Sequence, residues 1–238
     1  MAAILTLTMR QLAGSKRLWI VLVLVALPLL GALLFHVGDT TTTSAEFADD
    51  ITASLVASGI LPLVMLLFAT SSFGNEVADR TLVYVAMKPL ARWRIVVPKL
   101  AASVVVGGIP VALSGLLAVA LIDDGSFGGA LATGAGLLVG AAAYAAVFTW
   151  AGLATRHALV IGLVYVFVWE ATLAAYLDGV RFLSIRRYTL SLIHTLDAER
   201  LASIDVPLGA GAAIVGIVIV IVAFSLLAVR KLRRMDIP

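Results

Sequence analysis

Cysteine is absent from this chain of 238 residues, and charged residues make up only 13% of it. Without cysteine the chain has no disulfide framework and no thiolate site for metal binding or redox chemistry. The low charge content, 62% hydrophobic residues and a mean hydropathy of +1.10 exclude a soluble globular domain of this length. The chain is therefore predicted to be a membrane protein.

Apolar runs long enough to cross a bilayer dominate the sequence, since a spanning helix needs about 20 apolar residues. They cover residues 18–37, 51–73, 100–122, 129–154, 159–177 and 206–229. The first run is too long for a signal peptide and lacks a small-residue cleavage site, so a retained helix is expected. The predicted fold class is all-α: a polytopic membrane protein with six transmembrane helices and a single transmembrane domain over residues 1–238.

The basic residues predict the orientation, because Lys and Arg are retained on the cytoplasmic side of a membrane. Placing the N-terminus inside puts 13 of the 17 basic residues in cytoplasmic segments, while most acidic residues fall outside. Both termini are therefore predicted to be cytoplasmic, in a multi-pass protein of the cell membrane. Anionic lipid headgroups attract such juxtamembrane charges, so the pI near 9.4 requires no nucleic-acid partner.

The segments between the spans differ in character. Residues 1–17 mix apolar and basic side chains and are expected to form an interfacial helix. The polar first external loop, residues 38–50, is expected to be irregular. The last external loop, residues 178–205, places apolar residues among charges and is expected to contain short helices on or within the membrane surface. Those helices either cap a substrate exit or only pack over the ends of the spans.

Small residues recur every four positions in the fourth span. They are Gly128, Ala132, Gly136 and Gly140. This spacing places them on one helix face, where they let another backbone approach closely. The stripe predicts a helix-packing seam, with a partner helix either from the same chain or from a second copy.

The segment 76–99 is the one long charged and amphipathic stretch among the spans. Glu76 and Arg80 stand at i and i+4, in the order that favours an ion pair on a helix. Pro89 is expected to end this helix, and Pro98 to lie in the first turn of the third span. Residues 74–99 are thus predicted to form a cytoplasmic loop with a helix along the membrane face, although a simple amphipathic connector has the same pattern.

A specific motif runs through this loop, E-x4-T-L-x6-P-x2-R-x6-K. It is formed by Glu76, Thr81, Leu82, Pro89, Arg92 and Lys99. The motif resembles the first cytoplasmic loop of type-2 ATP-binding cassette (ABC) transporter permeases, the six-helix membrane subunits of exporters that pair with a separate ATPase chain. Arg80 and Pro98 stand where that family usually has glycine. The six spans, the basic N-terminal lead-in and tail, and the enlarged last external loop agree with the resemblance.

The resemblance implies a mechanical role for the loop, which in this family docks in a groove of the ATPase and transmits its ATP-driven dimerisation to the membrane helices. The implied ATPase-coupling residues are Glu76, Arg80, Thr81, Leu82, Pro89 and Arg92, with Lys99 at the membrane boundary. The implied partners are ABC ATPase subunits and a second permease copy or a homologous permease. No catalytic, cofactor-binding or metal-binding residue is expected in this chain, and ATP and Mg would bind the partner ATPase.

Enzymatic alternatives find little support in the sequence. No nucleotide-binding loop of the form G-x4-G-K-[ST] occurs, so the chain cannot be the ATPase itself. An intramembrane serine protease of the rhomboid type would need glycine two residues before Ser114, where Ala112 stands. It would also need a histidine deep in another span, whereas the three histidines, His36, His157 and His194, lie near predicted helix ends or in a loop.

Two non-enzymatic alternatives remain open. A secondary transporter or channel could use Glu170, the only acidic residue well inside a predicted span, because ionisable groups in membranes often mark ion paths. A structural hydrogen bond from Glu170 to a hydroxyl or an indole on a neighbouring helix is the other interpretation. A nontransporting membrane anchor of a signalling ATPase complex would carry the same coupling loop. The aliphatic spans fit an amphiphilic or lipid-like substrate, and they leave ions, peptides and drugs open.

Overall fold

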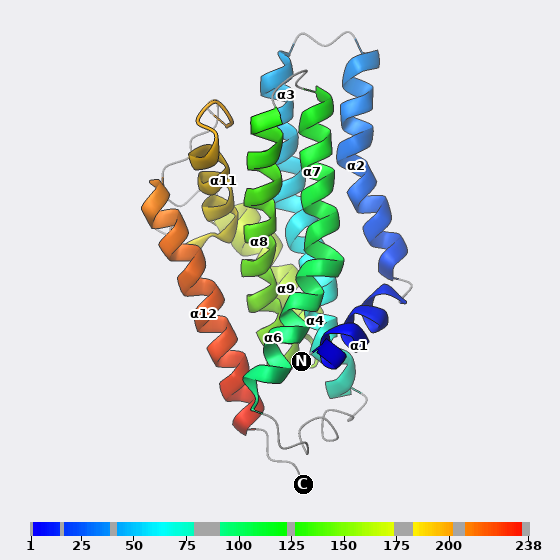
Figure 1. The fold of residues 1–238 in the computed structure, drawn as a ribbon, viewed down its shortest axis with the longest axis vertical. Helices are drawn as coiled ribbons and strands as arrows, with labels where there is room; N and C mark the ends of the chain where they lie inside the picture. Colours follow the sequence, from blue (N-terminus) through cyan, green and yellow to red (C-terminus); the bar gives the residue numbers. More distant parts are fainter. Residues whose placement is uncertain are drawn as a thin grey trace.

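The computed structural model describes residues 2–14, 17–38, 42–78, 91–122, 127–173, 183–201 and 208–234. Within these residues all regular structure is helical, as the all-α prediction requires. Long helices stand side by side around the central helix α8, Phe127–Ala154, whereas the N-terminal helix α1, Ala2–Ala13, is set at an angle to them near their lower ends (Figure 1).

The helices follow the predicted spans. In chain order after α1 they are α2 (Arg17–Val37), α3 (Ser44–Asp50), η1 (Ile51–Ile60), α4 (Leu61–Ala78), α6 (Trp93–Ser103), η2 (Val104–Gly108), α7 (Ile109–Ile122), α8, α9 (Ala158–Val164), η3 (Tyr165–Leu173), α11 (Ile185–Leu196) and α12 (Ala210–Arg234). The segments η1, η2 and η3 are π-helical and continue the neighbouring α-helices without a break.

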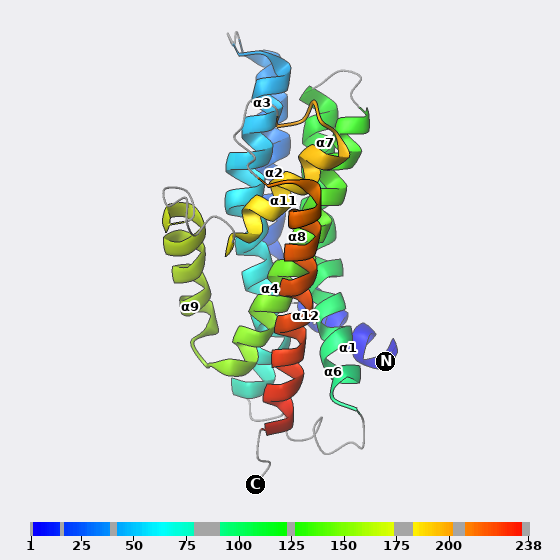
Figure 2. The ribbon, with the colours of Figure 1, turned by 90° about the vertical axis from the view of Figure 1, so that its left-hand side faces the viewer.

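By length and composition, five of the described helical units are long and apolar enough to cross a membrane. They are Arg17–Val37, Ser44–Val77, Trp93–Ile122, Phe127–Ala154 and Ala210–Arg234. The fifth predicted span, residues 159–177, corresponds to α9 and η3, and its apolar part within the described residues, Ala158–Glu170, is shorter. Figure 2 shows this unit at one edge of the bundle.

The expectation of an irregular first external loop is wrong for residues 44–50, which form α3. Thr43 caps this helix: its hydroxyl accepts a hydrogen bond from the Glu46 backbone N–H at 3.3 Å, and the Glu46 carboxylate accepts one from the Thr43 N–H at 3.4 Å. This reciprocal capping box satisfies two backbone donors that a helix start leaves unpaired. The second spanning helix therefore begins seven residues earlier than its hydropathy suggests.

The ends of the predicted cytoplasmic loop are also helical. Helix α4 continues through Ala78, and α6 begins at Trp93, so Pro98 lies inside α6 and not in its first turn. Ile95 and Val96 are fully buried, in a cluster that includes Leu232 of α12. This burial stabilises the early start of α6, which the basic residues around it conceal from a hydropathy reading.

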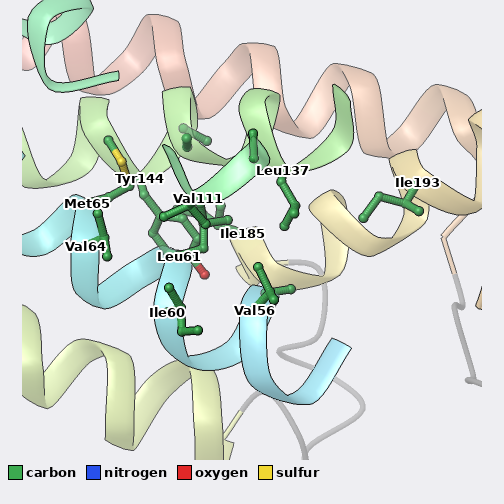
Figure 3. Packing of buried hydrophobic residues seen from close by; sticks show 14 of the residues in the cluster. Val56, Ile60, Leu61, Val64, Met65, Val111, Leu137, Tyr144, Ile185 and Ile193 are labelled. Atoms are coloured by element: carbon green, nitrogen blue, oxygen red, sulfur yellow. The ribbon is translucent and has the colours of Figure 1, made fainter. Parts of the chain in front are cut away.

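The core lies where α8 meets η1, α4, α7 and α11. Leu61 and Met65 of α4 lie beside Tyr144 of α8, and Leu137 of α8 and Ile193 of α11 lie further along the same cluster (Figure 3). In contrast, α2 and α12 flank the bundle, and only 17% of the apolar stretch of each is buried (Figure 1). Their outward leucine, isoleucine and valine side chains suit contact with lipid tails.

The cytoplasmic orientation of both termini is tested by labelling a single cysteine. Because the chain has no cysteine of its own, Thr42→Cys, exposed before α3, creates one reactive thiol. A membrane-impermeant maleimide is expected to label it in intact cells, and to label the control Ala91→Cys, exposed at the opposite end, only after the membrane is opened. The reverse pattern would invert the topology.

Candidate functional site

A buried ion pair joins the two helices that flank the predicted cytoplasmic loop. Lys99 Nζ of α6 lies 2.6 Å from Glu76 Oε1 of α4, and the two side chains are 2% and 13% exposed. The same ammonium donates a hydrogen bond to the Ser72 carbonyl and lies 4.4 Å from the centre of the Phe73 ring. A buried charge is tolerated only with such close partners, so this geometry fixes α4 and α6 to each other at the base of the loop.

The expected pairing of Glu76 with Arg80 stays a prediction. Glu76 turns its carboxylate to Lys99, and Arg80 lies outside the described residues. Lys99 lies buried between two packed helices, and its position at the membrane boundary stays a prediction. Both residues belong to the recognised motif, but its spacing carries no sign that they pair across 23 positions.

The remaining coupling residues are only partly visible. Thr81, Leu82 and Pro89, like Arg80, lie outside the described residues, so docking through them stays a prediction. Arg92 is half-buried directly before α6, and its carbonyl accepts hydrogen bonds from the backbone N–H groups of Ile95 and Val96 at 3.0 and 3.1 Å. It thus stands at the point where the loop enters the membrane helix.

The small-residue stripe of α8 packs against α11 of the same chain. A Cβ added to Gly140 would lie 2.3 Å from Thr189 Oγ1, and one added to Gly136 would lie 2.3 Å from Ile193 Cγ1. Further along, the Cβ position of Gly128 faces Asp197 Oδ2 at 3.7 Å, and Ala132 between them is buried. The seam therefore holds α11, the helix of the predicted last external loop, which crosses α8 at near-backbone distance.

A second buried ion pair fixes the far end of this loop. Arg200 Nη2 lies 2.8 Å from Asp49 Oδ1 in α3, and Asp49 Oδ2 accepts the Leu201 N–H at 3.0 Å. Leu201 has a φ of 62°, a left-handed conformation that a non-glycine side chain adopts only when its surroundings hold it. The loop is thus anchored to both α8 and α3.

Glu170 is buried, at 2% exposure, and faces the start of α11. Its Oε1 accepts hydrogen bonds from the Tyr165 hydroxyl at 3.0 Å and the Ile185 N–H at 2.9 Å, and its Oε2 accepts one from Ser184 Oγ at 2.6 Å. Ser184 is itself the N-cap of α11. Donors from both η3 and α11 therefore converge on one carboxylate, at the helix end that favours negative charge.

These contacts define what Glu170 does in this conformation. Each of these three partners donates a hydrogen bond to Glu170, so the carboxylate holds the N-terminus of α11 against η3. Hydroxyl groups are among those partners, whereas the neighbouring indole of Trp169 is directed to the Leu183 carbonyl at 3.5 Å. The sequence marked Glu170 as a lone intramembrane acid but gave no sign of Ser184, which lies outside the predicted spans.

Ser114 and two of the histidines make structural contacts. Ser114 Oγ donates to the Val25 carbonyl at 2.5 Å and so ties α7 to α2. His36 Nε2 lies 2.7 Å from the Leu121 carbonyl, and His194 Nδ1 lies 2.8 Å from the Arg200 carbonyl. None of these contacts joins a serine to a histidine, as a protease mechanism would need.

The seam predicts a strong effect of one methyl group. Gly136→Ala is expected to lower the free energy of unfolding by about 1–3 kcal/mol, because its Cβ would overlap Ile193. Gly59→Ala is the control, since nothing lies within 4 Å of that Cβ. Thermal melting in detergent measures both, and Ile193→Ala should relieve the clash in a double variant. Equal melting of the two alanine variants would mean that α11 does not occupy the seam.

Comparison with known proteins identifies the matching family. Residues 12–177 match the family model described as "ABC-2 family transporter protein". The match covers more than half of the chain and includes Glu76, Lys99, the segment between α4 and α6, and all of η3. Comparison with curated proteins found no match.

Proposed function

Because this chain belongs to the ABC-2 transporter family, we propose that it is the membrane-spanning permease subunit of an ATP-binding cassette exporter, driven by a separate ATPase subunit. The family match over residues 12–177 is the observation that carries the proposal. The chain is a multi-pass membrane protein, as the match and the five long apolar helices show. The direction of transport and the ATPase partnership are proposed.

The proposed coupling begins at the loop between α4 and α6. An ATPase that moves this loop would move both helices together, since the Glu76–Lys99 pair holds them at its base. Helix α4 packs along α8, and Gly152 of α8 lies so close to the Thr70 carbonyl that an added Cβ would be 2.5 Å from that oxygen. Closely packed helices transmit displacement as rigid units, so a tilt of α4 would reach α8.

The external end of this path is α11. Because α11 lies in the α8 seam and is held by Glu170, a movement of α8 against η3 would strain its two attachments. This arrangement suits a helix that covers a substrate exit. A second permease copy or a homologous permease would complete the translocation path, and the exposed faces of α2 and α12 are available for lipid or for that copy.

Docking is tested at Leu82, on the expected apolar face of the loop helix. Leu82→Asp would place a charge in the ATPase groove, at a cost of several kcal/mol. The protein is expected to insert normally but to lose co-purification with the ATPase, or stimulation of its ATP hydrolysis. Val37→Asp is the control, because Val37 is 86% exposed at the other end of the bundle and should leave both measurements unchanged.

The alternatives give different results in the same preparation. If Leu82→Asp binds and stimulates the ATPase like wild type, or if no ATPase co-purifies with the native chain in mild detergent, the exporter proposal fails. Transport by the chain alone, driven by an ion gradient, would identify a secondary transporter. Normal stimulation of the ATPase without transport of any amphiphile would favour the nontransporting anchor of a signalling complex.

A further inference from the structure

A polar cavity of about 180 Å³ opens at the end of the bundle that carries the cytoplasmic loop. It lies between the start of α2, the last turns of α4, and the turn from α8 to α9. Its polar lining consists of Arg17, Thr70, Ser71, Asn75, Thr155 and Arg156. By the same measure one water molecule needs roughly 10–15 Å³, so the cavity has room for a group much larger than a single water.

The two arginines differ in how they are held. Arg17 is half-buried, and its Nη1 donates to Ser71 Oγ, whose own proton goes to the Leu67 carbonyl at 2.5 Å. Arg156 is exposed, and it makes no hydrogen bond or ion pair with any residue in the described part of the chain. A guanidinium has five N–H donors, so both side chains keep donors for a ligand.

The charge of this lining is one-sided. Two arginines, Arg17 and Arg156, line the cavity, and none of the residues that line it is acidic. Like charges brought together in a partly enclosed space repel, and an anion placed between them removes that repulsion. Phosphate oxygens match the planar guanidinium fork and bind it through paired, charge-assisted hydrogen bonds. The amide of Asn75 adds two donors to the same space.

The surroundings favour a phosphate carried by a lipid. Leu159 lines the cavity and is 39% exposed, and the next positions of α9, Val160 and Ile161, are 63% and 53% exposed. Leu163, one turn further along α9 from Leu159, is 42% exposed, so apolar side chains continue from the cavity along the bundle, where acyl chains would lie. Trp19, 73% exposed near the start of α2, is the residue type that concentrates at headgroup depth.

We propose that this cavity binds the phosphate group of an anionic membrane lipid in the leaflet next to the cytoplasmic loop. Basic pockets between transmembrane helices on the cytoplasmic side recognise such headgroups. The shared chemistry is a phosphate group, which free inorganic phosphate also offers. The site borders the coupling loop, whose first residues Gly74 and Asn75 belong to the cavity lining, and it does not depend on the exporter proposal. A lipid bound there would join α2, α4 and the start of α9.

The test uses the full chain purified in detergent and titrated with phosphatidylglycerol, with bound lipid counted by native mass spectrometry. Arg156→Gln is the decisive variant because its side chain has no partner within the described residues. It is expected to weaken phosphatidylglycerol binding about tenfold, as the loss of charge-assisted hydrogen bonds predicts. Arg17→Gln should act in the same direction. Arg230→Gln, an equal loss of charge on the exposed face of α12, should change binding less than about twofold.

Further arms identify the source of the phosphate and check folding. If phosphatidylglycerol stays bound in millimolar inorganic phosphate, the result supports a lipid as the ligand. If inorganic phosphate displaces it, and this displacement depends on the same two arginines, the ligand is a soluble phosphate and the lipid proposal is overturned. Arg156→Lys keeps the charge but not the fork, so it should restore only part of the binding. Unchanged melting of Arg156→Gln establishes that it folds. Binding by Arg156→Gln equal to wild type, or reduced no more than in Arg230→Gln, would overturn the site.

Discussion

Replacing Lys99 with methionine is expected to uncouple the membrane helices from the loop without preventing insertion. The substitution leaves the Glu76 carboxylate without its ammonium partner and the Ser72 carbonyl without its donor. Removing one member of a buried ion pair typically costs about 3–5 kcal/mol. Insertion should not suffer, since methionine enters a membrane more readily than lysine. The expected readouts are a lower melting temperature and loss of ATPase stimulation in reconstituted membranes.

A double variant separates the effect of the unpaired charge on stability from the effect of lost packing. Glu76→Gln together with Lys99→Met removes the uncompensated charge, and replacing a buried pair by similar neutral side chains is often neutral for stability. The double variant should therefore recover most of the melting temperature lost in Lys99→Met. If Lys99→Met melts and stimulates like wild type, or if the double variant is no better than the single one, the pair does not hold α4 and α6 together.

Hydropathy predicted the spanning helices well because a backbone inside lipid must satisfy its own hydrogen bonds, which leaves few alternatives to a helix. The predicted ends of the helices were less accurate, since outside the lipid the backbone can also bond to water, and local contacts then decide where a helix begins. The Thr43–Glu46 capping box was readable in the sequence as T-x-x-E before an apolar run, yet the polar composition of the loop outweighed it. The early start of α6 depends on contacts with α12, which no local pattern reveals.

Side chains that form the candidate sites were recognised more readily than their partners. The spacing of the glycines marked a seam on α8. Its partner α11 lies in a loop whose mixture of charged and apolar residues was compatible both with a cap over a substrate exit and with simple packing over the helix ends. Glu76 and Lys99 were marked by a motif, and Glu170 by its isolation in an apolar run. Their contacts depend on how distant helices pack, as with Asp49 and Arg200, and one sequence does not contain that information.

Glu170→Leu is expected to release α11 and abolish transport, whereas Glu170→Gln should keep much of both. Leucine would leave the hydroxyls of Tyr165 and Ser184 and the N–H of Ile185 without an acceptor. Each buried unsatisfied donor costs about 1–3 kcal/mol, so the leucine variant should lose roughly 3 kcal/mol or more. Glutamine keeps a carbonyl oxygen for Tyr165 and Ile185, and its amide can donate to Ser184 Oγ once that hydroxyl turns.

Ser184→Ala provides the graded control for Glu170. It removes one of the three donors and the N-cap of α11, so a loss of about 1 kcal/mol is expected, between the glutamine and leucine variants. Melting temperature and transport should then fall in parallel in the order Glu170→Gln, Ser184→Ala, Glu170→Leu, because all three substitutions weaken the same attachment of α11. A different order would point elsewhere: total loss of transport in Glu170→Gln, with normal melting and an assembled complex, would require an ionised carboxylate and favour the secondary transporter over the structural role.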